Sequence, residues 1–346
     1  MSEQSERTGR QSGLRFGYGT NGFANHRLTD ALAVIADLGY QGVALTLDHD
    51  HLDPFAPELA RRVTRVADQL RDLDLAVVIE TGARYLLDPW RKHAPTLLHD
   101  DPAQRLEFLR RAVTIGADLG AEAVSFWAGV RPAEVPEPTA WARLVTGTAT
   151  IVAAADAAGV PLGFEPEPGM LVQTIADWRA LRAALGSPPG FGLTLDIGHC
   201  RCLEPASVPE CVTDVAEHLV NVQIDDMRRG VHEHLEFGTG EIDFPPVLRA
   251  LADVGYRGLV AVELPRHSHA APTVAAESLA FLTEAERVGA ASAVDGAASA
   301  ADGMSTARPS LCLPGGNTDR PVIGPRPSPR GKQSKRSVAP HTAEEE

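Results

Sequence analysis

Three acidic residues each come directly after a short apolar run with the length of a buried strand. They are Glu165, Asp196 and Glu263, and the runs before them are 160–164, 191–195 and 259–262. If these strands are parallel and share one sheet, their carboxyl ends meet at one edge and the three carboxylates converge. Crowded, desolvated carboxylates repel one another, so a divalent cation is the simplest way to neutralise them. Taken singly, each acid could instead be the N-cap or first-turn charge of the following helix.

Other polar side chains stand at corresponding positions after the remaining predicted strands. We expect substrate contacts from Glu80, Trp127, Glu167, His199, Asp226 and His232. The indole of Trp127 would pack on the face of a sugar or cyclitol ring. His199 lies three residues beyond Asp196 and would face the same site, whereas His232 and His234 are either functional or ordinary exposed loop residues.

The elements that carry these residues follow a repeating order, in which an amphipathic helical segment leads through a turn, often at a glycine, into an apolar run. The predicted helices span 31–38, 57–73, 102–119, 139–158, 174–185, 207–218, 244–254 and 272–286. The predicted strands span 14–18, 42–47, 75–79, 123–127, 160–164, 191–195, 219–224 and 259–262. Such alternation is typical of parallel strands joined by right-handed crossovers.

Eight strand and helix units fit a closed (β/α)₈ TIM barrel in number and in size. A doubly wound open sheet is the alternative, and it usually begins with a glycine-rich phosphate-binding turn. The segment Gly17-Tyr18-Gly19-Thr20-Asn21-Gly22 places two glycines suitably but lacks the full dinucleotide-binding pattern. We therefore predict the barrel.

We divide the chain into a disordered N-terminus (1–12), the barrel (13–287) and a disordered tail (288–346). The tail is rich in Ala, Ser, Gly and Pro and contains no Phe, Tyr or Trp. Such a composition cannot bury enough apolar surface to offset the entropy lost on ordering. We expect removal of the tail to leave the melting temperature of the barrel unchanged.

Composition limits the class of protein and its partners. Of the 346 residues, 44% are hydrophobic and 23% are charged, which is enough apolar material for a large core. The net charge of −14 disfavours binding to nucleic acid or to anionic lipid. Because no apolar segment has the length of a membrane helix or the character of a secretion signal, we expect a cytoplasmic protein with reduced cysteines. A small-molecule partner is favoured, and a homo-oligomer is compatible with the sequence.

Four segments resemble the xylose-isomerase-like barrel superfamily of sugar phosphate isomerases and epimerases. They are 162–166 (LGFEP), 195–199 (LDIGH), 238–244 (GTGEIDF) and 255–263 (GYRGLVAVE). In the epimerase members of that superfamily, a Glu, an Asp, a His and a Glu on strands five to eight hold one divalent metal ion. The resemblance places these ligands at Glu165, Asp196, position 223 and Glu263, and it makes His199 similar to a histidine that contacts substrate.

The sequence departs from that pattern on the seventh strand, where Gln223 replaces the histidine and Asp225 replaces a lysine. An amide oxygen can ligate a hard cation, so Gln223 would favour Mn²⁺ or Mg²⁺, with Co²⁺ or Zn²⁺ as the alternatives. The departure could also weaken binding. A third alternative is that Asp226, His232 or His234 supplies the missing ligand.

The resemblance implies a metal-dependent isomerase or epimerase of a sugar, sugar phosphate or cyclitol ketone. Such an enzyme transfers a proton next to a carbonyl through an enediolate, and Glu165 and Glu263 are the predicted acid and base pair. A dehydratase acting on a keto-cyclitol shares the first step. A non-catalytic sugar-binding barrel is favoured only by the Gln223 departure, and a nuclease similar to endonuclease IV would require additional histidines.

Overall fold

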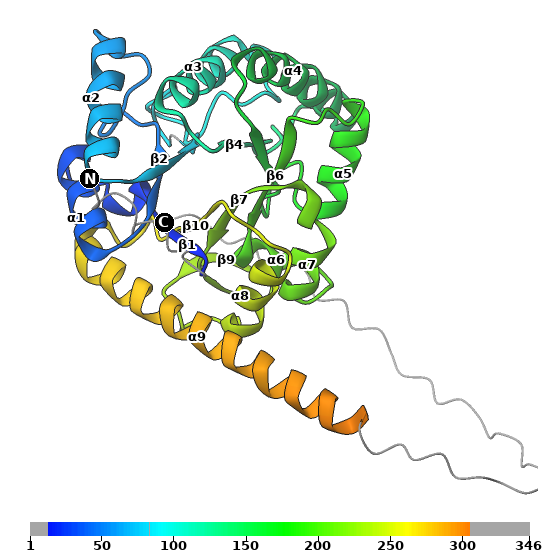
Figure 1. The fold of residues 1–346 in the computed structure, drawn as a ribbon. Coiled ribbons are helices and arrows are strands. Elements are labelled where there is room, and N and C mark those ends of the chain that lie inside the picture. The colour runs from blue at the N-terminus through cyan, green and yellow to red at the C-terminus, as the bar shows by residue number, and fades with distance from the viewer. Residues whose placement is uncertain (1–12, 83, 305–346) are drawn as a thin grey trace, which may run out of the picture. The chain divides into compact units, whose positions relative to one another are not determined.

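The computed structural model describes residues 13–82 and 84–304, with no side-chain description for 292–304. Eight parallel strands close into a barrel in the order β1-β10-β7-β6-β5-β4-β3-β2, and helices surround them (Figure 1). The barrel strands are β1 (Arg15–Gly19), β2 (Gly42–Thr46), β3 (Ala76–Glu80), β4 (Val124–Trp127), β5 (Leu162–Glu165), β6 (Phe191–Asp196), β7 (Leu219–Ile224) and β10 (Leu259–Val262). The predicted (β/α)₈ TIM barrel is therefore confirmed.

The helices separate successive strands as predicted. They are α1 (Leu28–Leu38), α2 (Leu59–Asp72), α3 (Ala103–Leu119), α4 (Glu137–Ala158), α5 (Ile175–Ala184), α6 (Ile197–Leu203), α7 (Val208–Asp214), α8 (Phe244–Asp253) and α9 (Ala271–Met304), with short 3₁₀ turns η1 (Thr20–Phe23), η2 (Ala216–His218) and η3 (Ser268–Ala270). Helices α1, α3 and α4 end at Gly39, Gly120 and Gly159 in the left-handed conformation, which glycine adopts without steric cost.

Three local features differ from the sequence-based prediction, and one of them is α6, which was not predicted. An antiparallel hairpin of β8 (Asp226–Arg228) and β9 (Val231–Leu235) follows the seventh barrel strand. It was not predicted, because its strands are short and polar. The predicted helix 207–218 is also divided, into α7 and the 3₁₀ turn η2.

Apolar side chains of the strands and helices form the main core, while the barrel also encloses buried polar side chains. Buried Val, Ile, Leu and Phe side chains from every strand contribute to one continuous cluster, in which Phe126, Phe164 and Phe191 form a row of aromatic contacts. On the opposite face of these strands, Thr194 and Ser125 are joined by a buried hydrogen bond of 2.9 Å. Because this core supports the strands from below, the side chains at their carboxyl ends have fixed positions.

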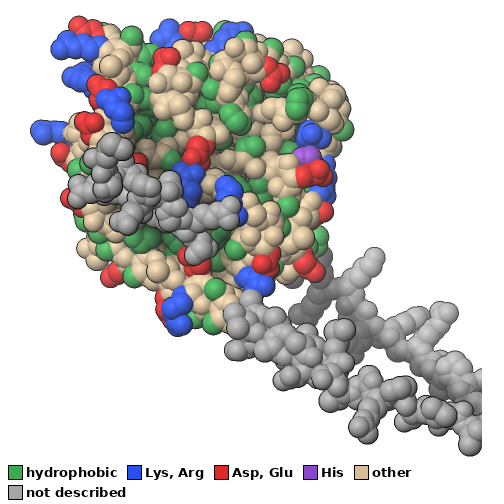
Figure 2. Space-filling model, in the orientation of Figure 1, with side chains coloured by type: hydrophobic (Ala, Val, Ile, Leu, Met, Phe, Trp, Pro, Cys, Tyr) green, Lys and Arg blue, Asp and Glu red, His purple; other side chains and the backbone are tan. Residues whose placement is uncertain are grey.

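Charged groups on the surface are mixed in sign. On the face shown in Figure 2, acidic and basic side chains alternate with apolar ones, and the described residues of this face form no continuous basic patch. None of the helices in the described part of the chain combines the length and the apolar character needed to span a bilayer. The described cysteines, Cys200, Cys202 and Cys211, are free thiols, and Cys312 lies outside the described residues.

The boundary of the barrel at residue 287 stays a prediction, and the structure adds that α9 runs without a break past this residue to Met304. The segment after 287 is rich in alanine, which has the highest helix propensity. Gly289 is buried, and a Cβ atom there would lie 2.5 Å from the carbonyl oxygen of Pro245 in α8. The compact unit that contains the barrel extends to Ala298, and the helix from Ser299 onward belongs to a second unit. Predicted disorder in 1–12 and 305–346 lies outside the described residues.

Truncation tests the predicted boundary at residue 287. A chain that ends at Arg287 should melt a few degrees below a chain that ends at Ala298, because it loses the close contact of Gly289 with α8. A loss of about 1 kcal/mol corresponds to roughly 2–4 °C in a domain of this size. The comparison is made by thermal unfolding followed by circular dichroism. Equal melting temperatures would support the boundary at residue 287.

Candidate active site at the carboxyl ends of the barrel strands

Most of the predicted site residues line a cavity of about 220 Å³ at the carboxyl ends of the barrel strands, whereas Asp196 is buried and does not line it. Glu165 is the last residue of β5, Asp196 is the last residue of β6, and Glu263 follows β10. Pairing in the sheet aligns them, since Trp127 is opposite Glu165 and Asp196 is opposite Gln223. The predicted convergence of the three acids is therefore present in the fold.

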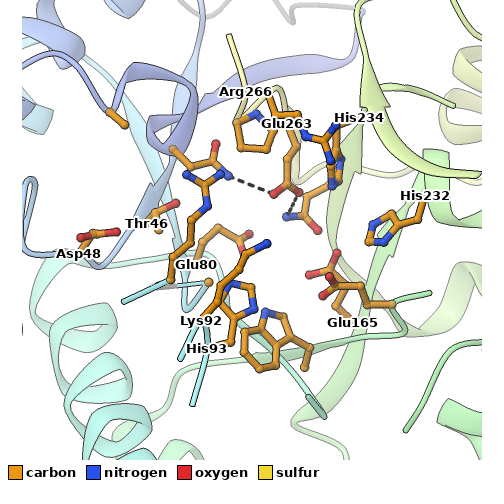
Figure 3. Close-up of a pocket in the computed structure, with 18 of the residues that line it drawn as sticks. Thr46, Asp48, Glu80, Lys92, His93, Glu165, His232, His234, Glu263 and Arg266 are labelled. Atoms are coloured by element: carbon orange, nitrogen blue, oxygen red, sulfur yellow. Dashed lines mark hydrogen bonds between the residues drawn. The ribbon is translucent and has the colours of Figure 1, made fainter. Parts of the chain in front are cut away.

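Glu263 is held by two side-chain amides, as Figure 3 shows. Asn21 Nδ2 donates to Glu263 Oε1 at 3.0 Å, and Gln223 Nε2 donates to Glu263 Oε2 at 2.6 Å. At the base of the cavity, Asn221 Nδ2 donates to Glu80 Oε1 at 3.0 Å, which links β7 to β3 on the opposite side of the barrel. The amides on β7 therefore orient two of the carboxylates.

Removal from water makes these carboxylates weak acids. Burial, followed by the charges of neighbouring acids, raises the pKa of Glu80 and of Glu165 well above the usual range. Glu263 is partly open to the cavity, yet the surrounding protein still desolvates it and raises its pKa. Burial and the charge of Glu263 raise the pKa of Glu167 to about 8. Perturbed carboxylates gathered in one cavity mark a functional site.

The donor set fits a divalent cation. Ligand atoms of Glu165, Asp196 and His199 lie within 4.8 Å of one another, and so do those of Asp196, His234 and Glu263. Asp196 Oδ2 and Gln223 Oε1 are buried and have no hydrogen-bond partner among the described residues. Buried oxygen acceptors without donors are costly, and a hard cation would satisfy both atoms.

Two neutral histidines lie beside Glu165. Burial lowers the pKa of His199 to about 4, and burial together with neighbouring histidines lowers the pKa of His232 to about 3. The Nδ1 atom of His199 is 3.1 Å from the carbonyl oxygen of Pro166, and its Nε2 atom is 3.0 Å from His232 Nε2. A carbonyl can only accept, so His199 donates from Nδ1 and accepts at Nε2 from His232. Both rings line the cavity.

His234 has a different environment. Its Nδ1 atom is hydrogen-bonded to the carboxylate of Asp225, which is completely buried. Burial lowers the pKa of His234, but Asp225 and other acids outweigh this effect and raise it to about 10. In the metal-free protein, the His234 imidazolium therefore balances part of the negative charge of the site.

Asp226 does not have its predicted position, because it is buried and does not line the cavity. Its two carboxylate oxygens accept hydrogen bonds from the backbone N–H groups of Met227, Gly238, Gly240 and Ile242. Through these bonds, the Asp226 carboxylate holds the segment that follows β9. The geometry therefore gives Asp226 a structural role in place of contact with substrate.

The remaining predicted residues, Glu80, Trp127, Glu167, His199 and His232, line the cavity. Sequence reasoning missed Arg84, Lys92 and His93, which line it from the segment between β3 and α3. One sequence signal was available, since the chain has three lysines and the other two are Lys332 and Lys335 in the tail. In a barrel whose other basic side chains are all arginines, a single lysine is notable. Figure 3 shows Lys92 reaching into the cavity.

Comparison with known proteins identifies the family to which the chain belongs. The sequence pattern of the family described as "Xylose isomerase-like TIM barrel" matches residues 32–285, and the chain belongs to this family. L-ribulose-5-phosphate 3-epimerase of Escherichia coli is 30% identical over 232 residues, which cover 64% of this chain and 80% of the relative. L-ribulose 3-epimerase of Mesorhizobium japonicum is 29% identical over 242 residues, covering 67% and 74% respectively.

Solved structures show the same fold. A structure of L-ribulose 3-epimerase superposes with a TM-score of 0.65 at 22% identity, covering 86% of this chain and all of the other (100%). 3-Keto-D-glucoside 4-epimerase of E. coli superposes with a TM-score of 0.64 at 15% identity, covering 78% and 99%. At these identities, the likeness establishes the barrel architecture.

Proposed function

We propose that this protein is a metal-dependent epimerase or isomerase of a ketose, a sugar phosphate or a cyclitol ketone. The observation that carries the proposal is the placement of Glu165 and Glu263, two desolvated carboxylates that face one cavity from strands separated by β6 and β7. The epimerase names of the sequence relatives support the same class of reaction.

Residues of the chain would hold and polarise the substrate. A divalent cation bound by Glu165, Asp196 and Glu263, with the Gln223 oxygen as the predicted fourth ligand, would stabilise negative charge on the carbonyl and adjacent hydroxyl oxygens. The indole of Trp127 stacks at 5.0 Å from the His93 ring, and this aromatic wall suits the apolar face of a sugar ring.

Proton transfer is assigned to the two glutamates. Their raised pKa values bring their basicity closer to neutral pH, where a general base is most effective. One carboxylate removes the proton on the carbon next to the carbonyl, and the other returns a proton. Return to the opposite face of that carbon gives an epimer, whereas return to the neighbouring carbon gives an aldose or ketose isomer.

The cations at the entrance favour a substrate with an anionic group. Arg84 and Lys92 line the cavity and have no ion-pair partner among the described residues, and Arg266 contacts Glu233 at 3.3 Å. Figure 3 shows Lys92 and Arg266 entering from opposite sides. Basic side chains beside a set of buried acids are well placed to bind a phosphate or carboxylate away from the reacting carbon.

Metal content and solvent exchange test the proposal together. Untagged protein should contain about one equivalent of divalent metal by mass spectrometry, and Glu165→Ala should lose it. In D₂O, the metal-loaded protein should introduce deuterium next to the carbonyl of at least one ketose, ketose phosphate or inosose. Metal-loaded protein that exchanges no proton in any of these substrates would indicate a binding protein, and release of water from the substrate would indicate a dehydratase.

A further inference from the structure

We propose that His234, carried by the β8–β9 hairpin and held by Asp225, supplies the imidazole ligand of the metal site. This inference rests on the proposed function only in assuming that the carboxylates bind a metal ion. The imidazole then comes from the β8–β9 hairpin and not from strand β7, while Gln223 supports Glu263 through Nε2 and its Oε1 atom stays available to the ion.

The position of His234 follows from the hairpin. β9 pairs antiparallel with β8, and Asp226 is opposite Leu235 in the ladder. The carboxylate of Asp226 also holds the chain just beyond β9, through Gly238 and Gly240. The hairpin is therefore anchored on both sides of His234, and the side chain of His234 is only 15% exposed.

Asp225 determines which ring nitrogen of His234 remains available to a metal ion. The hydrogen bond between His234 Nδ1 and the Asp225 carboxylate keeps a proton on Nδ1, so Nε2 becomes the ligand when an ion displaces the second proton of the imidazolium. Nε2 has no hydrogen-bond partner in the described part of the chain. A carboxylate that orients a metal-binding imidazole in this way is a recurrent arrangement in metalloproteins.

The fold makes room for Asp225. Its carboxylate is completely buried, and a Cβ atom at Gly198 would lie 2.0 Å from Asp225 Oδ1. Only glycine at the start of α6 therefore admits this carboxylate. Burying an acid is costly, and His234 is its single ion-pair partner among the described residues. Because this ion-pair partner lines the cavity, the buried Asp225 has the role of positioning the His234 ring.

The distances are suitable for one ion. A ligand atom of His234 lies within 4.8 Å of those of Asp196 and Glu263. Two ligands on opposite sides of an ion are about 4.2–4.8 Å apart for bond lengths of about 2.1–2.4 Å. Gln223 already donates to Glu263 from Nε2, so its nitrogen fixes that ligand while its oxygen stays available to the ion.

The ligand set predicts the metal. The carboxylates of Asp196 and Glu263 together with the His234 imidazole suit Mn²⁺, Co²⁺ or Zn²⁺ better than Mg²⁺, which prefers oxygen ligands and retains water. Co²⁺ is the most informative probe, because its visible spectrum reports the ligands directly.

Metal titration tests the assignment without substrate. Isothermal titration of metal-depleted protein with Co²⁺ or Mn²⁺ should give a Kd at least about 100-fold weaker for His234→Ala, with an altered Co²⁺ spectrum. Asp225→Asn, which leaves the ring but not its charged partner, should weaken binding about 10–100-fold. His269→Ala, which removes an exposed histidine outside the cavity, should match the wild type.

A second variant separates loss of a ligand from loss of structure. Gln223→His in the His234→Ala background should recover metal affinity by restoring an imidazole from strand β7. Wild-type affinity and spectrum in His234→Ala, or absence of recovery by Gln223→His in a folded double variant, would overturn the proposal. Since no substrate is used, failure to find sugar epimerisation would leave this result standing, whereas a wild-type protein that binds no metal would remove both proposals.

Discussion

Glu263→Gln should lower kcat by about 10²–10⁴-fold, the usual contribution of one general acid or base, while the barrel remains folded. The amide cannot accept a proton from carbon, but it has the volume of the carboxylate. Asn21 can still donate to its oxygen, and Gln223 can rotate its own amide to accept from the new NH₂ group. Loss of one charge also reduces repulsion among the buried acids.

Kinetics must separate proton transfer from metal binding, because Glu263 is assigned to both. Turnover and solvent deuterium incorporation are therefore measured at saturating Mn²⁺, with metal occupancy determined on the same sample. Loss of exchange in fully loaded protein assigns Glu263 to proton transfer. Glu217→Gln is the matched control, since that side chain is 84% exposed, and it should behave as the wild type. Retained exchange in loaded Glu263→Gln would remove Glu263 from the proton-transfer pair.

Arg105→Ala should destabilise the protein by about 3 kcal/mol, because several interactions of one buried guanidinium disappear together. Nε donates to the carbonyl of Pro95 at 2.9 Å, and Nη2 donates to the carbonyl of His93 at 2.7 Å. The same group lies 5.1 Å from the centre of the Trp127 ring. Burial lowers the pKa of Arg105 to about 10, so it remains charged at neutral pH.

Arg105→Ala should also weaken substrate binding. Arg105 holds the carbonyls on the segment that carries Lys92 and His93, so its removal should raise KM more than it lowers kcat. Chemical denaturation and steady-state kinetics measure the two effects. Arg110→Ala on the exposed face of the same helix is the control and should change stability by less than about 0.5 kcal/mol. Unchanged stability in Arg105→Ala would show that other contacts hold this segment.

Local sequence patterns predicted the barrel and the residues at its strand ends. Apolar runs interrupted by glycine turns specify strands and helices through interactions between near neighbours, and eight repeats leave a closed parallel barrel as the favoured arrangement. The convergence of Glu165, Asp196 and Glu263 then follows from topology, because all barrel strands end at the same face. The same local patterns did not locate the end of the last helix, because the alanine-rich segment after residue 287 lacks a clear stop signal and α9 continues through it to Met304.

The environment of each site residue depended on contacts between distant segments. No local pattern indicates that Asp226 turns toward the backbone of 238–242 while its neighbour Asp225 turns toward His234. Likewise, the entry of Lys92 into the cavity depends on the buried Arg105, which lies in the next helix. The sequence by itself determined which residues stand at the ends of the strands, because strand and helix formation is local. Only the tertiary structure decided which of them share hydrogen bonds and charge, because those contacts join segments far apart in the chain.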